Sequence, residues 1–259
     1  MTSTAATFKH INTNLQRTLG QTAKQPEVKR AADYYLAKIT SIKSIEGFLK
    51  DDRVYQFAMK AYGLDEMIYA KAFMRKVLTE GVDSSTSFAN KLSDHRFKDF
   101  ATVFNFARYG GTATAFSRTQ QGAVDRYVRQ TLEADAGRTS EGVRLALYFE
   151  RTAPDITNPL GLLADKALLK VTQVTLGLPA STSMLSLDRQ IELIKKKLDV
   201  ADFKDTAKLD KFLSRFASLW DLENPTDTSN SVPGILVSTP NVGLDTNTLT
   251  VLQNIRLGR

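Results

Sequence analysis

The side chains best suited to chemistry in this sequence are one histidine and its acidic neighbours. Cysteine is absent, and the two histidines are His10 and His95. A helix would place Asp99 four residues beyond His95 on the same face, so the two could form a general base held by a carboxylate or part of a metal site. A surface histidine beside an acidic helix neighbour is the commoner explanation, and a zinc site needs three or four ligands. We therefore predict no catalytic and no metal-binding residue, and the role of His95 stays open.

Other acidic residues and one glycine pair also invite a functional interpretation. The carboxylate pairs are Asp51/Asp52, Asp65/Glu66 and Glu133/Asp135. All lie at expected helix starts or on exposed helix faces, where negative charge stabilises the helix. Gly110 and Gly111 lack the Lys-Ser/Thr pair of a phosphate loop, so we interpret them as a hinge or chain reversal. These patterns predict no cofactor and no enzymatic activity, and an enzyme of unknown type is the least favoured alternative.

The composition is that of an ordinary soluble globular protein. The chain has 259 residues, of which 42% are hydrophobic and 24% charged, with a net charge of +7. Most lysines and arginines alternate with acidic residues, which is typical of solvated helix faces, so we predict no specific nucleic-acid binding. Whether the basic charge serves another kind of binding stays open. No apolar run is long enough for a transmembrane segment, and the first residues lack the apolar core of a signal peptide.

The elements that must position these residues are helical throughout. Apolar residues recur at spacings of three and four, and strand-like alternation is missing, which predicts an all-α helical bundle. One such stretch, residues 88–107, carries an aromatic stripe of core type. We divide the chain into a flexible amphipathic segment (1–24), a first helical repeat (25–110), connecting helices with a second repeat (111–222), and a flexible tail with a short terminal helix (223–259).

The two repeats are predicted from segments that share one pattern. "DDRVYQFAMKAYGL" begins at Asp51, and "ADKALLKVTQVTLGL" contains Asp165. Each aspartate can cap a helix by accepting a backbone N–H. Gly63 and Gly177 then stand where a left-handed residue ends a helix, each followed by a leucine that can make the hydrophobic contact of a Schellman motif. The pattern indicates a duplicated helical unit whose copies are joined by a pair of helices.

Both ends of the chain are polar segments with a narrow apolar stripe. The stripe residues are Phe8, Ile11, Leu15 and Leu19 at one end and Leu249, Leu252 and Ile255 at the other. A thin stripe makes a helix that is marginal alone and needs a partner. We therefore predict that these residues bind a protein partner or allow self-association. The alternative is that both segments pack onto the helical body.

Longer strings resemble a known family. The chain is similar to the alphaproteobacterial family DUF1217 in four segments. These are "AMKAYGLDEMIYAKAFMRKVLTEGV", "SFANKLSDHRFKDFATVFNFARYG", "KLDKFLSRFASLWDL" and the segment from residue 120 to residue 156. The similarity covers residues 25–222. It implies an all-helical protein that is often encoded among flagellar genes in rhizobia and their relatives, and it implies no established activity and no catalytic residues.

The resemblance favours two functional hypotheses. The first is a non-enzymatic structural or protein-interaction component of the bacterial flagellum, which is exported without a cleaved signal. The second is a cytoplasmic regulator or export chaperone that binds another flagellar protein. We accordingly expect a cytoplasmic or flagellum-associated protein with a protein partner that belongs to the flagellum. The identity of that partner and the oligomeric state are not encoded in any motif.

Overall fold

The computed structural model describes residues 3–225, and every regular element in that range is a helix. The all-α prediction is therefore confirmed for this part of the chain. The helices of the N-terminal half are α1 (Thr4–Thr13), α2 (Leu15–Ala23), α3 (Pro26–Ile39), α4 (Ile45–Lys50), α5 (Asp52–Ala61), α6 (Lys71–Glu80), α7 (Phe88–Lys91), α8 (His95–Val103) and α9 (Phe106–Tyr109). Those of the C-terminal half are α10 (Gln121–Thr139), α11 (Glu141–Thr152), α12 (Pro159–Ala164), α13 (Lys166–Leu176), α14 (Leu187–Lys195) and α15 (Thr206–Glu223). None of these helices is long and apolar enough to span a bilayer.

Six short 3-10 helices connect the α-helices of residues 3–225. They are η1 (Asp65–Met67), η2 (Gly110–Ala115), η3 (Ser117–Thr119), η4 (Ala153–Asp155), η5 (Ala180–Met184) and η6 (Val200–Lys204). Gly110 ends α9 with a φ of +50°. The chain then turns through η2 and η3 before α10, which agrees with the break predicted at Gly110 and Gly111.

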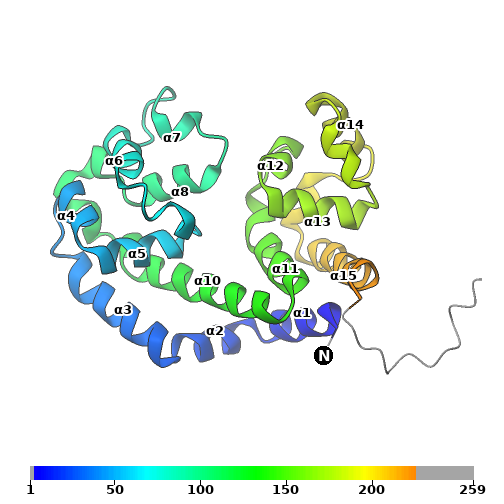
Figure 1. Cartoon of the computed structure of the whole chain (residues 1–259), viewed down its shortest axis with the longest axis horizontal. Coiled ribbons are helices and arrows are strands. Elements are labelled where there is room, and N and C mark those ends of the chain that lie inside the picture. The colour runs from blue at the N-terminus through cyan, green and yellow to red at the C-terminus, as the bar shows by residue number, and fades with distance from the viewer. Residues whose placement is uncertain (1–2, 226–259) are drawn as a thin grey trace, which may run out of the picture. The chain divides into compact units, whose positions relative to one another are not determined.

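The buried side chains form two separate clusters. The first runs from Val28 to Val128, and the second from Val143 to Phe216 with Phe8 added from the N-terminus. We call α3–α9 with the first half of α10 the first lobe, and α11–α15 with α1 the second lobe. Figure 1 shows α10 running from α5 toward α11, and both helices pack against it. α10 therefore joins the lobes as part of the predicted helical pair.

The first lobe is built around packed phenylalanines. Phe48 lies 5.1 Å from Phe104 and 5.8 Å from Phe106, measured between ring centroids, and Phe100 lies 4.8 Å from Phe104. Aromatic pairs at such distances add to the free energy gained by burial. The prediction that the aromatic stripe of α8 forms core is thus confirmed.

The stretch predicted as one helix over residues 88–107 is three short helices. The side chain of Asp94 accepts a hydrogen bond from the Arg96 N–H at 2.9 Å and begins α8. The side chain of Asn105 accepts one from the Arg108 N–H at 2.9 Å and begins α9. Because short polar side chains compete with the helix for backbone groups, each of them restarts the helix in a new direction.

The two segments used to predict the duplication begin alike. The carboxylate of Asp51 accepts the N–H three residues on at 3.1 Å, and that of Asp165 does so at 3.0 Å. A tyrosine hydroxyl supports each cap: Tyr34 donates to Asp51 at 3.2 Å, and Tyr148 donates to Asp165 at 2.6 Å. Each tyrosine precedes its aspartate by the same number of residues.

The two segments also end alike. Gly63 and Gly177 have φ values of +66° and +61°, in the left-handed region where a Cβ would be strained. The N–H of Leu64 donates to the carbonyl five residues back at 2.9 Å, and that of Leu178 does so at 2.8 Å. Both helices therefore end in the predicted Schellman motif. These shared features agree with a duplication, which stays a prediction.

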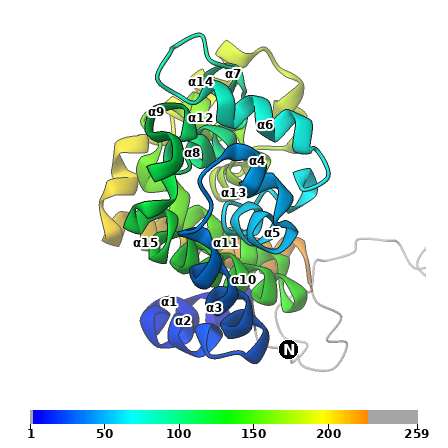
Figure 2. The ribbon, with the colours of Figure 1, turned by 90° about the vertical axis from the view of Figure 1, so that its left-hand side faces the viewer.

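The N-terminal segment differs from the expectation of a flexible docking arm. Phe8 is only 3% exposed and lies in the second core, where Ile11 packs beside it, whereas Leu19 packs against the first core. Leu15 is half-buried. The stripe is covered because α1 packs against α11 and α15, and α2 packs against α10. Figures 1 and 2 show the course of these helices. Residues 4–23 thus belong to the body, whereas Leu249, Leu252 and Ile255 lie outside the described residues.

Polar contacts and a close approach fix α1 in place. The carboxylate of Asp221 accepts the N–H of Thr4 at 3.0 Å. A Cβ on Gly142 would lie 2.4 Å from Cδ1 of Trp220 and 2.8 Å from Cγ2 of Thr4. Only glycine fits at this position, because α1, α11 and α15 meet there.

We expect Phe8→Ala to lower the free energy of unfolding by about 3 kcal/mol, since it removes a buried ring and leaves a cavity. Urea denaturation followed by circular dichroism measures this change. Leu222→Ala is the control, because Leu222 is exposed and its truncation should cost less than about 0.5 kcal/mol. Equal stability of the Phe8→Ala variant and the wild type would instead show that the N-terminal segment does not pack on the body.

Candidate functional site

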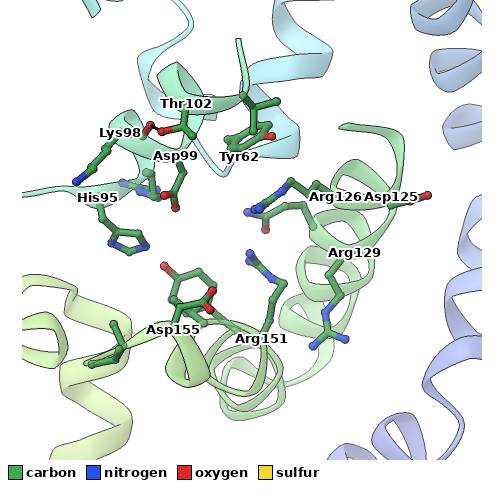
Figure 3. A pocket seen from close by; sticks show the side chains of 16 residues that line it. Tyr62, His95, Lys98, Asp99, Thr102, Asp125, Arg126, Arg129, Arg151 and Asp155 are labelled. Atoms are coloured by element: carbon green, nitrogen blue, oxygen red, sulfur yellow. Dashed lines mark hydrogen bonds between the residues drawn. The ribbon is translucent and has the colours of Figure 1, made fainter. Parts of the chain in front are cut away.

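A cavity of about 710 Å³ lies where the two lobes face each other, and we call it the interlobe cavity. Its walls come from the end of α5, from α8, from the middle of α10, and from α11 with η4 (Figure 3). The volume is in the range that holds small molecules in other proteins. Its lining carries both signs of charge: Lys98, Arg126 and Arg151 line it together with Asp99, Asp125 and Asp155, and His95 lies among them.

His95 and Asp99 reach this cavity from one helix, as their spacing predicts. Asp94 caps α8 immediately before His95, which sets the direction of the helix. Figure 3 shows both side chains on the same wall. Partial burial raises the pKa of Asp99 and nearby Asp155 adds to this, although His95, Arg126 and Lys98 oppose it. The carboxyl group therefore holds its proton more tightly than an aspartate in water.

Two cations on the walls have no ion-pair partner among residues 3–225. These are Lys98 of α8 and Arg126 of α10. The guanidinium of Arg126 instead lies 4.9 Å from the ring centroid of Tyr62, as a cation–π contact. Burial raises the pKa of Tyr62 to about 12. Arg126 and Lys98 are thus the positively charged side chains of the cavity wall that form no ion pair in the described residues.

The most buried charged side chains beside the cavity form ion pairs with one another. Nε of Arg129 lies 2.9 Å from Glu133, and its Nη2 lies 2.6 Å from Glu150. Nε and Nη2 of Arg151 lie 2.8 Å and 3.0 Å from the two oxygens of Glu133. The side chain of Arg129 also donates to the carbonyl of Leu147 at 2.8 Å. We call Arg129, Glu133, Glu150 and Arg151 the junction network, because it ties α10 to α11.

The sequence did not reveal the junction network. Glu133 was expected on an exposed face but is only 2% exposed, and Arg129 is 8% exposed. The spacing of Arg129 and Glu133 fits a helical ion pair, yet that spacing alone does not distinguish a buried pair from a solvated one. Burial is decided by α11, which brings Arg151 and Glu150 over the pair.

The remaining acidic residues singled out from the sequence lie at helix starts or in ion pairs. Asp51 caps α5, and Asp52 pairs with Lys71 at 2.5 Å. Glu66 pairs with Arg96 at 3.1 Å. Asp65 belongs to η1, and Asp135 lies 3.1 Å from Arg138. None of these pairs lies against a reactive group in the part of the chain that is described.

Among the groups that line the cavity, Asp99 and His95 have side chains suited to proton transfer. In residues 3–225 no hydrogen bond joins the two, and no hydroxyl donates to His95. The nearby hydroxyl of Thr102 donates to the backbone carbonyl of Lys98 at 2.7 Å. Nowhere in this range do three acidic or histidine side chains come together closely enough to hold a metal ion. His10, the other histidine, is exposed on α1.

We expect Glu133→Gln to lower the free energy of unfolding by about 3 to 5 kcal/mol, because Arg129 and Arg151 would lose their shared carboxylate while remaining buried. Chemical denaturation measures the loss. Glu141→Gln removes the same group from an exposed pair with Arg144 and should cost less than about 1 kcal/mol. Similar losses in the two variants would contradict the structural weight given to the junction network.

Asp99→Asn should be more stable than the wild type at pH 7, and the difference should vanish as the pH falls toward 3.8, the ordinary pKa of aspartate. A folded-state pKa above the unfolded value means that stability falls as pH rises between the two values. An asparagine never acquires the charge and so avoids this loss. Urea denaturation of both proteins at several pH values tests the prediction. A less stable variant at pH 7 would show that the cations of the cavity stabilise the charged form.

Comparison with known proteins places the chain in a family. The family model "Protein of unknown function (DUF1217)" matches residues 61–209, which is more than half of the chain. The crystal structure of an Agrobacterium tumefaciens protein, solved in a structural genomics programme, is 43% identical in sequence with a TM-score of 0.80, over 87% of this chain and 98% of that one. No functionally curated protein matches. The resemblance seen in the sequence is thus confirmed, and the chain belongs to the DUF1217 family.

Proposed function

We propose that this protein is a non-enzymatic structural or protein-interaction component of the bacterial flagellar system. The flagellar part of the proposal is supported by the gene neighbourhood that the DUF1217 resemblance implies. The relationship to an Agrobacterium protein fits the alphaproteobacterial range of that resemblance. The interaction part is supported by the surface of the molecule.

The observation that carries the proposal is a set of large apolar side chains left in contact with water. They are Tyr69, Leu160, Met184, Leu185, Leu187 and Leu222. Single exposed apolar residues are ordinary, but neighbouring ones mark protein-binding surfaces. Three of the six follow one another at the start of α14. A binding surface of this kind needs a rigid support, which the junction network and the packing of α1 provide.

The interlobe cavity gives less support to an enzyme. Its arginines Arg129 and Arg151 are engaged in the junction network, and Thr102 uses its hydroxyl within α8. The remaining pair, His95 and Asp99, faces a cavity without a hydrogen-bonded nucleophile in the described residues. We therefore assign no catalytic residue and no cofactor, and no specific nucleic-acid site.

The proposed location follows from the proposed function. As a flagellar component, the protein would be exported without a cleaved signal and would associate with the flagellum. The alternative from the same gene context is a cytoplasmic regulator or export chaperone that binds another flagellar protein. Both are interaction proteins, and they differ in where the protein accumulates.

We expect deletion of the gene in the bacterium that encodes it to reduce swimming in soft agar and the number of filaments seen by electron microscopy. A plasmid copy of the wild-type gene should restore both, and so should the His95→Ala/Asp99→Ala double variant, because the proposal gives these residues no catalytic role. Normal motility of the deletion strain would contradict the flagellar function. Failure of the stably folded double variant would favour an enzyme.

Fractionation separates the two kinds of interaction protein. Presence in purified basal bodies or in the culture supernatant is the expected result for a structural component. Protein confined to the cytosolic fraction, together with a motility defect, would replace the leading proposal by the regulator or chaperone.

A further inference from the structure

Most of the exposed large apolar side chains of the second lobe belong to α12, η5 and the start of α14, whereas Leu222 lies apart on α15. Met184 is 88% exposed and Leu187 is 49% exposed, with Leu185 exposed between them. Leu160, which is also exposed, belongs to α12, and α12 packs against α14. Figure 1 shows these two helices as neighbours in the second lobe. We call Leu160, Met184, Leu185 and Leu187 the α14 surface.

The helix that follows the Schellman motif in the first lobe has no such surface. There α6 buries Met74, Val77 and Leu78 completely. Its Phe73 lies 5.0 Å from the ring of Phe88 in α7 and 5.1 Å from that of Phe97 in α8. α14 buries only Ile194 among its residues, although it is similarly amphipathic. The difference arises because the first lobe inserts α7 after α6, whereas the second lobe continues from α14 directly into η6.

The first lobe therefore shows what kind of element covers such a helix. The cover in the first lobe is a helical segment that presents an aromatic ring to α6. In the second lobe the segment between α14 and α15 is η6, whose Phe203 packs on Phe149 and Phe212 and which lies mainly against η4 and α15. An external helix with large apolar side chains on one face can supply the missing layer, as in other helix-in-groove complexes.

The unpaired charges of α14 are Asp188 beside Leu187 and, at the C-terminal end of the helix, two lysines that indicate an acidic flank on the partner helix. Lys195 and Lys196 are exposed, and neither has an ion-pair partner in residues 3–225. Arg189, by contrast, is paired with Glu192 at 2.5 Å, and Lys197 donates to the carbonyl of Leu176. Lys195 follows Leu187 by about two helical turns, or about 12 Å. A partner with carboxylates at that distance from its apolar anchors would meet the free lysines.

We propose that the α14 surface binds an amphipathic helix of a protein partner, with an apolar face over Met184 and Leu187 and acidic residues opposite Lys195 and Lys196. The inference rests on the proposed interaction function and specifies the chemistry of the partner. Apolar contact supplies the affinity, and charge complementarity selects the partner and its direction.

Two synthetic peptides of about five helical turns test the proposal. Both carry the same leucines at helical spacing, and one has glutamates and the other lysines on the flanks. Fluorescence anisotropy with the full-length protein at low salt should show the glutamate peptide binding at least about tenfold more tightly. Raising the salt concentration should reduce this preference, because the lysines are exposed.

Substitutions on the α14 surface locate the binding. Leu187→Ser should weaken the glutamate peptide about tenfold or more, whereas Tyr69→Ser, at an exposed apolar residue of the first lobe, should leave it unchanged. The double substitution Lys195→Glu/Lys196→Glu should reverse the preference in favour of the lysine peptide. All of these side chains are exposed, so the variants should keep the circular dichroism and unfolding midpoint of the wild type.

Equal binding of the two peptides, absence of binding, or insensitivity to Leu187→Ser would overturn the inference. So would a dimer in sedimentation velocity that Leu187→Ser dissociates, because the surface would then belong to a second copy of the chain. If the peptide test fails but the deletion strain has a motility defect, the flagellar function is retained and its binding surface lies elsewhere on the protein. Peptide binding together with normal motility of the deletion strain would support the α14 surface as a binding site and contradict the flagellar function.

Discussion

The architecture depends on the junction network between α10 and α11. Removing charged groups from water costs several kcal/mol for each ion, and this cost is offset only where several partners meet in good geometry. Glu133 meets that condition by receiving both Arg129 and Arg151, while Glu150 and a backbone carbonyl complete the coordination of Arg129. α11 can therefore cross α10 in few ways. That crossing sets the position of the second lobe and the walls of the interlobe cavity.

The N-terminal helices add a second constraint of a different kind. α1 packs on α11 and α15, and α2 packs on α10, so one short stretch of chain contacts both lobes. Phe8 contributes apolar burial, and Asp221 accepts the free N–H groups at the start of α1. Apolar contact tolerates small shifts, whereas the charged junction network requires defined distances. The two constraints together restrict hinge motion between the lobes more than either would alone.

Local chemistry in the sequence predicted what depends on a few neighbouring residues. The caps at Asp51 and Asp165 and the left-handed glycines Gly63 and Gly177 are of this type, because each needs only its own helix end. The placement of Phe8, the burial of Glu133 and the breaks around Asp94 depend on tertiary contacts or on competition between a cap and a helix. A narrow apolar stripe has the same pattern whether it covers a core or awaits a partner. The environment of α1 and the exposure of α14 therefore could not be distinguished beforehand.

The same comparison bears on the exposed apolar side chains of the second lobe. If the lobes descend from one unit, the segment that covers α6 has no counterpart over α14, and a face that was core has become surface. Leaving several large apolar side chains in water costs stability unless something covers them for part of the time. In the interlobe cavity, by contrast, Arg129 and Arg151 are engaged in the junction network. Covering the exposed apolar side chains at α14 would gain free energy, and under the proposal the two unpaired lysines of this segment restrict which partner can cover them.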